Sequence, residues 1–190
     1  MKFVFRPNQS IVLVGMMGVG KTSIGRRISK KLNIPFYDSD QEVELAAGCT
    51  ISDIYELYGE SAFRDAERRV IKRLLNEPPH VLSTGVGAFA DEVNRTLIKQ
   101  QTVSVWLDAT IDSIIARVSR RSHRPQLENA DPRETLSGLF DQYGQHYQEA
   151  DIHIECSHDE PGVTVEKIYT AINQYLGGTY GQDPDDEDDA

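Results

Sequence analysis

The sequence predicts an α/β domain in which helices cover both faces of a mainly parallel, doubly wound sheet of about five strands, giving three layers. Three observations support this fold class. Short apolar runs rich in β-branched residues alternate along the chain with longer segments that show helical periodicity. Strand–helix alternation of this kind places successive strands parallel to one another. The length of 190 residues suits one compact domain with a sizeable core.

Five segments are expected to form strands, because each is a short run of β-branched or aromatic residues bounded by turn residues. The first of them, "SIVLVG", is strongly apolar and is expected to be a buried strand that ends at glycine. Ligands bind at the carboxyl ends of the strands in domains of this type. The strands are expected at residues 10–15, 36–40, 80–84, 102–107 and 151–155.

Seven segments are expected to be helical. In residues 21–32 the apolar side chains recur at i, i+4 and i+8, and residues 91–100 begin with acidic and end with basic side chains, as the helix dipole favours. Gly48 is placed to end the second helix, Gly59 to interrupt the third, and Pro132 to begin the sixth. The helices are expected at residues 21–32, 40–48, 50–75, 91–100, 110–121, 132–150 and 162–176.

The charge distribution separates a mildly acidic body from a strongly acidic terminal segment. The net charge is −10, and residues 183–189 hold six acidic side chains and no basic one. We therefore expect a single domain over residues 1–178 and an acidic, disordered tail over residues 179–190. An acidic body also argues against nucleic acid as the main partner.

Cysteine content and hydropathy indicate the compartment. The two cysteines are too few for a disulfide framework, and their spacing does not suit a metal site. The chain has no run of about 18 apolar residues, which argues against a membrane span, and its N-terminus does not resemble a signal peptide. We expect a cytoplasmic protein that makes no membrane contact.

The strongest motif is "GMMGVGKT" at residues 15–22, which matches G-x-x-x-x-G-K-[ST] between an expected strand and an expected helix. Its glycines let backbone N–H groups wrap phosphates, and the helix N-terminus adds positive potential. Lys21 is expected to reach the β- and γ-phosphate oxygens, and Thr22 to bind Mg²⁺. The alternative is an ordinary strand-to-helix turn. The residues expected to bind ATP in this loop are Gly18, Val19, Gly20, Lys21, Thr22 and Ser23.

A phosphate loop alone leaves hydrolysis, transfer and switching open, and two aspartates in "YDSD" favour transfer. Asp38 and Asp40 end the second expected strand, where strand alternation would point both carboxylates the same way. One carboxylate can hold Mg²⁺, often through water, and the other can orient an acceptor hydroxyl and take its proton. The alternative is that Asp40 caps a solvated helix N-terminus.

Two further motifs are expected near the same edge of the sheet. In "FRDAE", Arg64 and Glu67 lie at i and i+3 of a helix, so that the glutamate could brace an arginine aimed at a substrate anion; the alternative is a weak surface ion pair. In "STGVGAF", the backbone of Gly85, Val86 and Gly87 could receive an oxyanion or hydroxyls. The alternative for this segment is a tight turn that needs glycine torsions.

The segment "RVSRRSHRP" is expected to belong to a mobile lid over about residues 117–132. It carries four arginines, and the last of them precedes a proline in a polar, turn-rich loop. Arg124 would neutralise charge on the transferred phosphoryl group when the lid closes on ATP, and Arg120 would stack on adenine. The alternative is a basic, solvated helix end.

Taken together and in this order, these five motifs resemble those of the shikimate kinase family: G-x-x-G-x-G-K-[ST], D-x-D, F-R-x-x-E, G-G-G and R-P. The resemblance spans about residues 8–176. It implies the nucleoside-monophosphate-kinase-like P-loop fold. It also implies transfer of phosphate from ATP to the 3-hydroxyl of shikimate, with Mg²⁺, in aromatic amino acid biosynthesis. Members of the family are typically monomeric, so a monomer is expected.

The resemblance also implies roles for individual residues. Asp40 matches the aspartate that binds the acceptor hydroxyls and acts as base, and Asp38 matches the one near Mg²⁺. Arg64 matches an arginine that pairs with the shikimate carboxylate, and the second glycine loop matches backbone that contacts the acceptor. Lys21 and the lid residue Arg124 complete the catalytic set that the resemblance implies.

Two residues depart from the family pattern. Val86 stands at the middle glycine, and we expect it to have a negative φ, with its side chain directed away from the acceptor. Counting back from Tyr147 puts Tyr143 where the family has a second arginine that clamps the shikimate carboxylate. Acceptor recognition is therefore expected to be weakened or altered. This leaves open a related kinase for another small polyol or hydroxy acid, or an ATP-binding module without catalysis.

Overall fold

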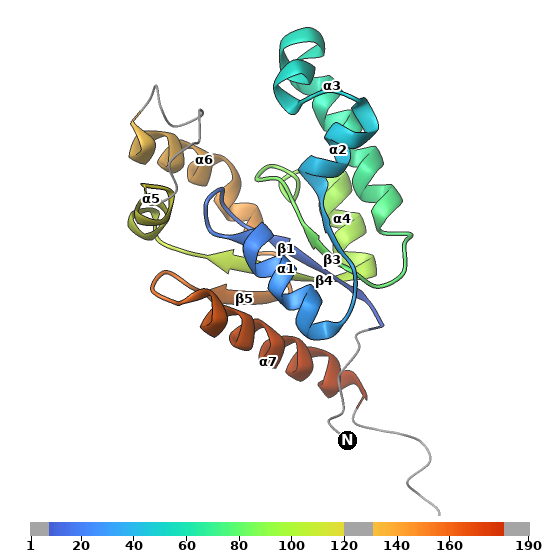
Figure 1. The fold of residues 1–190 in the computed structure, drawn as a ribbon, viewed down its shortest axis with the longest axis vertical. Helices are drawn as coiled ribbons and strands as arrows, with labels where there is room; N and C mark the ends of the chain where they lie inside the picture. The colour runs from blue at the N-terminus through green and yellow to red at the C-terminus, as the bar shows by residue number, and fades with distance from the viewer. Residues whose placement is uncertain (1–7, 120–130, 181–190) are drawn as a thin grey trace, which may run out of the picture.

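A five-stranded parallel sheet forms the centre of the molecule in the computed structural model, which describes residues 8–119 and 131–180 (Figure 1). The strand order is β2-β3-β1-β4-β5, and every neighbouring pair is parallel. This confirms the α/β class and the parallel sheet that the sequence predicts. The strands are β1 (Ser10–Val14), β2 (Phe36–Asp38), β3 (Val81–Ser83), β4 (Thr102–Asp108) and β5 (Ile152–Glu155).

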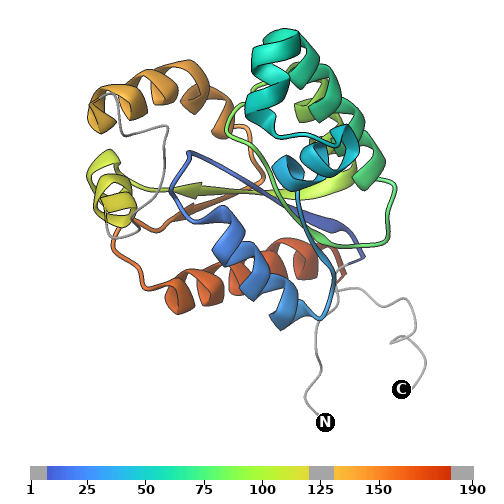
Figure 2. The same cartoon turned by 45° about the horizontal axis from the view of Figure 1, so that its top comes forward.

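The described residues form seven helices, and both faces of the sheet are covered by helices. Helices α1 and α7 lie together on one face, and α3, α4 and α6 lie on the other (Figure 2). The three layers of a doubly wound domain are therefore present. The helices are α1 (Lys21–Leu32), α2 (Ser39–Ala47), α3 (Ile51–Leu74), α4 (Glu92–Gln101), α5 (Ile111–Ser119), α6 (Pro132–Tyr147) and α7 (Pro161–Tyr180).

Helix boundaries follow from local residues in the way the sequence predicts. Gly48 ends α2 with a left-handed φ of 70°, and Gly59 interrupts α3 with φ 81° and ψ 172°. Pro132 lies in the first turn of α6, directly after Asp131, whose carboxylate accepts a hydrogen bond from the backbone N–H of Arg133. Glycine and proline thus fix three of the helix boundaries.

The last two helices end at positions that differ from those expected. Helix α6 ends at Tyr147 rather than at residue 150, and α7 continues past residue 176 to Tyr180. Most of the segment expected to form a lid, residues 120–130 with Arg120 and Arg124, lies outside the described residues. The two ends of that segment are helical instead, because residues 117–119 belong to α5 and Pro132 begins α6. Residues 181–190, which include the acidic segment, also lie outside the described residues.

The second strand is shorter than expected, and this changes the argument for its two aspartates. Strand β2 ends at Asp38, and α2 begins at Ser39. Asp38 is the N-cap of α2, because its Oδ1 accepts a hydrogen bond from the backbone N–H of Asp40 at 3.1 Å. The prediction that strand alternation orients both carboxylates is therefore wrong, and so is the alternative that Asp40 is the cap. The turn from strand into helix sets their directions.

Strand β1 lies at the centre of the sheet, and all of its residues are buried, as expected for a strand covered on both faces. The parallel register aligns Leu13 of β1 and Asp38 of β2 with Ser83 of β3. The carboxyl ends of these three strands are therefore side by side. The segments that follow them can line one common cavity.

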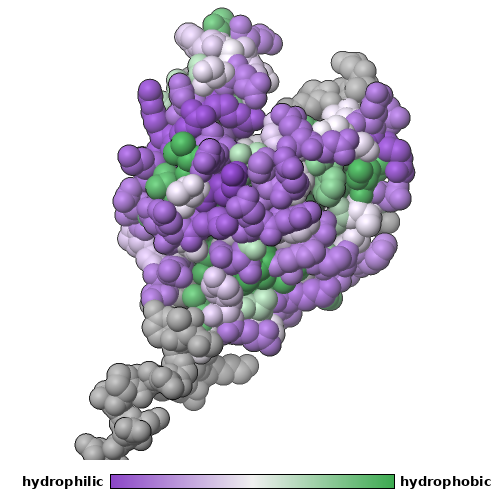
Figure 3. Space-filling view, turned by 180° about the vertical axis from the view of Figure 1, so that it is seen from behind, coloured by the Kyte–Doolittle hydropathy of each residue, from purple (hydrophilic) through white to green (hydrophobic). Residues whose placement is uncertain are grey.

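The outer surface is mainly hydrophilic on the face shown in Figure 3, where hydrophobic side chains form separate patches. The most exposed large apolar side chains are Leu45, Leu57 and Tyr58, which lie on α2 and α3. Single exposed apolar side chains are common on folded domains. In the part of the chain that the structure describes, no helix is long and apolar enough to cross a membrane.

The packing of α1 against the sheet can be tested at Gly25. A Cβ atom added there would lie 2.5 Å from Cε2 of Phe36 and 3.2 Å from Cδ1 of Leu13. Gly25→Ala is therefore expected to lower the free energy of unfolding by about 1–3 kcal/mol, because overpacking forces neighbouring side chains to move.

Gly138→Ala in α6 is the matched control, since a Cβ there meets nothing within 4 Å. It is expected to raise the free energy of unfolding by about 0.5–1 kcal/mol, because alanine favours a helix interior. Urea denaturation of both variants measures the difference. Equal effects of the two substitutions would contradict the close contact between α1 and the sheet.

Candidate active site

The phosphate loop connects β1 to α1, and its glycines adopt backbone conformations that other residues rarely reach. Gly15, Gly18 and Gly20 have φ angles of 135°, 77° and 108°. A Cβ atom on Gly15 would also lie 2.5 Å from the carbonyl oxygen of Leu107. The loop leads directly into the N-terminus of α1, which favours a bound anion. An ordinary strand-to-helix turn does not require three glycines of this kind.

Lys21 begins α1, and its side chain is buried against the phosphate loop. The ammonium Nζ donates to the carbonyl oxygens of Gly15 at 2.7 Å and Met16 at 2.8 Å. Lys21 also lines the larger of two cavities beside the loop. The loop carbonyls thus hold the cation close to the place where phosphates would lie.

Thr22 and Asp38 come together although they are distant in sequence. The hydroxyl of Thr22 donates to Oδ2 of Asp38 at 2.7 Å and lies 3.4 Å from the Ser83 hydroxyl. No group of three or more His, Cys, Asp or Glu side chains within residues 8–119 and 131–180 could hold a metal ion. A hydroxyl and one carboxylate nevertheless fit Mg²⁺, which keeps several waters and uses phosphate oxygens as further ligands.

Asp40 lies in the first turn of α2 and lines the same cavity as Lys21. Its Oδ1 is buried and has no hydrogen-bond partner among the described residues. Burial raises the pKa of this carboxyl above its ordinary value, and repulsion from Asp38 adds to the effect, while the Lys21 ammonium opposes it. A carboxylate in this environment is a stronger proton acceptor than an exposed aspartate.

Arg64 and Glu67 form an ion pair in α3 in which the glutamate is buried and the arginine is partly exposed, so the prediction of a bracing glutamate fits the geometry better than a surface pair. Nη1 of Arg64 donates to Oε2 of Glu67 at 3.0 Å, and the glutamate side chain is only 1 % exposed. Nη2 of the same arginine lies 3.4 Å from Oε1 of Glu60 and 3.4 Å from the Tyr143 hydroxyl. The Arg64 guanidinium also packs over the Phe63 ring, 5.2 Å from its centroid. One arginine is therefore held by four neighbours at one end of the cavity.

The second glycine loop follows β3, and its glycines are required for space rather than for torsions. Neither Gly85 nor Gly87 has a positive φ, so the explanation from glycine torsions is wrong. A Cβ on Gly87 would lie 2.6 Å from Nη2 of Arg64. A Cβ on Gly85 would lie 2.8 Å from Oδ1 of Asp40 and 3.0 Å from Oε1 of Glu67. Backbone and charged side chains thus meet without room for a methyl group.

Val86 has a negative φ, as predicted, and two side chains brace the loop around it. The Tyr147 hydroxyl donates to the Val86 carbonyl oxygen at 2.7 Å, and the Gly85 N–H donates to the Ser39 hydroxyl at 3.0 Å. The Gly85 N–H is therefore already engaged. No described residue accepts a hydrogen bond from the N–H of Val86 or Gly87. The direction of the Val86 side chain stays a prediction, since this residue packs on the core and also lines the cavity.

The larger cavity has a volume of about 730 Å³ and joins the two glycine loops. The phosphate loop lies at one end, and Arg64 and Tyr143 at the other. Most of the residues predicted from the sequence to bind ATP, metal or acceptor line it. They are Gly18, Gly20, Lys21, Thr22, Ser23, Asp38, Asp40, Arg64, Gly85, Val86, Gly87 and Tyr143.

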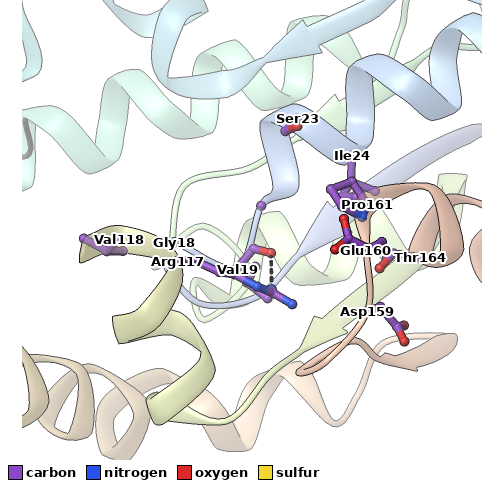
Figure 4. Close-up of a pocket in the computed structure, with 11 residues that line it drawn as sticks. Gly18, Val19, Ser23, Ile24, Arg117, Val118, Asp159, Glu160, Pro161 and Thr164 are labelled. Atoms are coloured by element: carbon purple, nitrogen blue, oxygen red, sulfur yellow. Dashed lines mark hydrogen bonds between the residues drawn. The ribbon is translucent and has the colours of Figure 1, made fainter. Parts of the chain in front are cut away.

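A smaller cavity of about 260 Å³ adjoins the phosphate loop (Figure 4). It shares Gly18, Gly20 and Ser23 with the larger cavity and adds Val19. Arg117 of α5 crosses it: the guanidinium donates to the Val19 carbonyl oxygen at 2.9 Å, as the dashed line in Figure 4 marks. The other wall comes from the segment between β5 and α7 and from the first turn of α7. The remaining lining residues are Ile24, Val118, Asp159, Glu160, Pro161 and Thr164.

Sequence reasoning did not single out this smaller cavity. Arg117 appeared only as one of several arginines in a basic segment, yet it also donates to the carbonyl oxygens of Cys156 and Ser157. Residues 159–161 carry no recognisable motif. The available signal was topological, because they follow the carboxyl end of β5, at the edge of the sheet where ligands bind.

Comparisons with known proteins agree with this arrangement. The family model described as shikimate kinase matches residues 17–173. A shikimate kinase of Caulobacter vibrioides is 51 % identical over 166 residues, which are 87 % of this chain and 83 % of that protein. One from Novosphingobium aromaticivorans is 46 % identical over 175 residues, with 90 % and 91 % covered.

A solved structure gives the same result in three dimensions. The shikimate kinase from Acinetobacter baumannii in complex with shikimate superposes with a TM-score of 0.82 at 34 % identity. The alignment covers 90 % of this chain and 96 % of that one. Sequence, fold and cavity therefore lead to one conclusion: the chain belongs to the shikimate kinase family.

Proposed function

We propose that this protein transfers the γ-phosphoryl group of ATP to the 3-hydroxyl of shikimate, which gives ADP and shikimate 3-phosphate. The observation that carries the proposal is the single cavity that joins the phosphate loop to Asp40 and Arg64. The Acinetobacter baumannii relative was solved with shikimate, and this supports the same acceptor here. We further propose a cytoplasmic monomer whose partners are small molecules rather than nucleic acid or a membrane.

The phosphates of ATP would lie on the backbone N–H groups of the phosphate loop. Lys21 would exchange its loop carbonyls for the β- and γ-phosphate oxygens. Thr22 and Asp38 would hold Mg²⁺, which neutralises phosphate charge when it is bound. These groups stabilise the phosphoryl group during transfer, because its charge is spread over oxygens that they contact.

The nucleotide base would occupy the smaller cavity, beside Arg117 and residues 159–161. The nucleotide would then extend from the smaller cavity along the phosphate loop into the larger cavity. Arg124 would neutralise charge on the transferred phosphoryl group and Arg120 would stack on adenine, as the sequence predicts for a lid.

Asp40 would act as the general base on the acceptor hydroxyl. Its unpartnered Oδ1 is free to accept the hydroxyl proton, and burial raises its pKa and with it the basicity of the carboxylate. The Lys21 ammonium favours the ionised form that can accept a proton. The hydroxyl oxygen would then attack a phosphoryl group that the phosphate loop holds in place.

The acceptor carboxylate would pair with Arg64 at the far end of the cavity. The N–H groups of Val86 and Gly87 would donate to acceptor oxygens, and the Tyr143 hydroxyl would supply one neutral hydrogen bond. Arg64 and Lys21 are the only arginine and lysine among the described residues that line this cavity. The carboxylate therefore depends on a single guanidinium.

Because only the Arg64 guanidinium would pair with the acceptor carboxylate, a second candidate function is a kinase for another small polyol or hydroxy acid. The direct test is ADP release, measured by a coupled assay with Mg²⁺-ATP and a panel of acceptors. Shikimate is expected to stimulate ADP release and to appear as a phosphate monoester. Turnover with another acceptor but none with shikimate would favour the second candidate. Binding of ATP without turnover on any acceptor would favour a binding module, against which the buried, unpartnered Asp40 argues.

Asp40→Asn tests the base. The substitution is expected to lower kcat by about 10²–10⁴-fold, the range typical of a general base, while the Kd for ATP stays unchanged. Rapid-quench measurement of the chemical step and equilibrium binding of ATP separate the two effects. Full activity in this variant would remove Asp40 from the base role.

The same variant has an expected effect on stability. Because the folded-state pKa of Asp40 is raised, its contribution to stability is complete below the ordinary value of 3.8 and is lost as pH rises through the folded pKa. At neutral pH the ionised group therefore destabilises the fold. Asp40→Asn is expected to raise the Tm at neutral pH, as measured by differential scanning calorimetry. A lower Tm would contradict the conclusion that burial of the ionised carboxylate destabilises the fold.

Tyr143→Arg tests the carboxylate end of the cavity. A charged hydrogen bond contributes about 1.5–3 kcal/mol and a neutral one about 0.5–1.5 kcal/mol, so the KM for shikimate is expected to fall by roughly 5- to 12-fold. Tyr143→Phe removes only the hydroxyl and is expected to raise that KM by roughly 2- to 10-fold. The KM for ATP serves as the internal control and is expected to stay constant. An unchanged shikimate KM in both variants would place Tyr143 away from the carboxylate.

A further inference from the structure

Glu67 is the most deeply buried carboxylate in the larger cavity, and only one of its oxygens is paired. Oε2 accepts a hydrogen bond from Nη1 of Arg64 at 3.0 Å. Oε1 is buried and has no hydrogen-bond partner among the described residues. A fully ionised carboxylate in this position would leave half of its acceptor capacity unsatisfied away from water, which is costly.

The unpaired oxygen faces other negative charge. A Cβ on Gly85 would lie 3.0 Å from Oε1 of Glu67 and 2.8 Å from Oδ1 of Asp40, so two unpaired carboxylate oxygens converge on this point. Asp91 at the N-terminus of α4 also repels a charge on Glu67. Burial, opposed by Arg64, raises the pKa of Glu67 to about 7.

The guanidinium of Arg64, which stabilises the Glu67 carboxylate, also interacts with other groups. Arg64 pairs with Glu67, lies 3.4 Å from the exposed carboxylate of Glu60, and contacts the Tyr143 hydroxyl, while Tyr55 also lies in its field. A carboxylate acceptor at Arg64 would add one more negative charge to the same guanidinium. Arg64 would then stabilise the negative charge of Glu67 less, because it would also pair with the acceptor carboxylate. The neutral form of Glu67 would therefore be favoured.

We propose that Glu67 is a specificity-determining residue at any pH where it is ionised in the empty site: it binds a proton when a carboxylate-bearing acceptor pairs with Arg64, and it stays ionised when a neutral acceptor occupies the cavity. The proton comes from the solvent and returns to it when the acceptor leaves. The inference rests on the proposed function, because it takes shikimate as the anionic acceptor. It adds a property of the acceptor site, namely that the anion and a proton bind together.

The proposal fixes the sign of the pH dependence. Below about pH 7 Glu67 already carries its proton in the empty site, so acceptor binding takes up none. Above that pH the proton must be captured on binding, and the Kd for shikimate is expected to rise by up to about tenfold per pH unit. The methyl ester of shikimate, which keeps the ring hydroxyls but has no charge, is expected to bind without this dependence.

Isothermal titration calorimetry of the 190-residue chain measures the proton uptake directly. Shikimate is titrated at about pH 8 in two buffers with different ionisation enthalpies, HEPES and Tris. Uptake of close to one proton per acceptor is expected in the wild type, and none with the methyl ester. Glu67→Gln, which mimics the protonated acid, is expected to abolish the uptake and to make the Kd for shikimate independent of pH.

Glu60→Gln is the matched control. Glu60 contacts the same arginine from four residues earlier in the helix, but its side chain is 62 % exposed, so Glu60→Gln is expected to keep the proton uptake of the wild type. Equal binding enthalpies in the two buffers would overturn the inference and leave the proposed function intact. Uptake that persists in Glu67→Gln would assign the proton to another group and would also overturn it. If Glu67→Gln fails to fold, the wild-type comparison of buffers and acceptors still decides.

A complete lack of shikimate binding is a separate outcome. It would contradict the proposed function, and with it the premise that an anionic acceptor reaches Arg64. Binding with buffer-independent heat and binding that is absent are therefore distinguished in the same experiment.

Discussion

The ion pair between the partly exposed Arg64 and the buried Glu67 is the constraint that shapes the acceptor end of the cavity. Removing one partner of such a pair would leave an uncompensated charge away from water, which is strongly destabilising. The guanidinium lies so close to the second glycine loop that Gly87 has no room for a Cβ, and Gly85 is equally confined by Glu67 and Asp40. The loop and the ion pair therefore have to be present together.

The parallel sheet places this acceptor end opposite the phosphate loop. Strands β1, β2 and β3 end side by side, so the phosphate loop, Asp38 and the second glycine loop start from one edge. Helix α3 brings Arg64 from one side, and α6 brings Tyr143 and Tyr147 from another. The larger cavity is the space that these segments enclose, and its two ends combine phosphate chemistry with recognition of an anion.

The fold was predictable from the sequence because its signals are local: β-branched runs, helical periodicity, and glycine or proline at the ends of helices. The residues around the larger cavity were predictable as types, but the reasons given for them were partly wrong. Gly85 and Gly87 need space rather than torsions, and Asp38 caps a helix where alternation had been assumed. Contacts across the fold decide both points. The same holds for Arg117, whose partners lie in the phosphate loop and beyond β5.

The central claim is that Arg64 selects an acceptor through its carboxylate. Its most direct test is the ratio of kcat/KM for shikimate to that for its methyl ester, measured in the wild type and in Arg64→Gln. Loss of one partner from a buried charge pair costs about 2–5 kcal/mol, so the wild-type ratio is expected to exceed about 30. In Arg64→Gln the ratio is expected to approach unity. An unchanged ratio would show that the carboxylate is recognised elsewhere and would contradict this account.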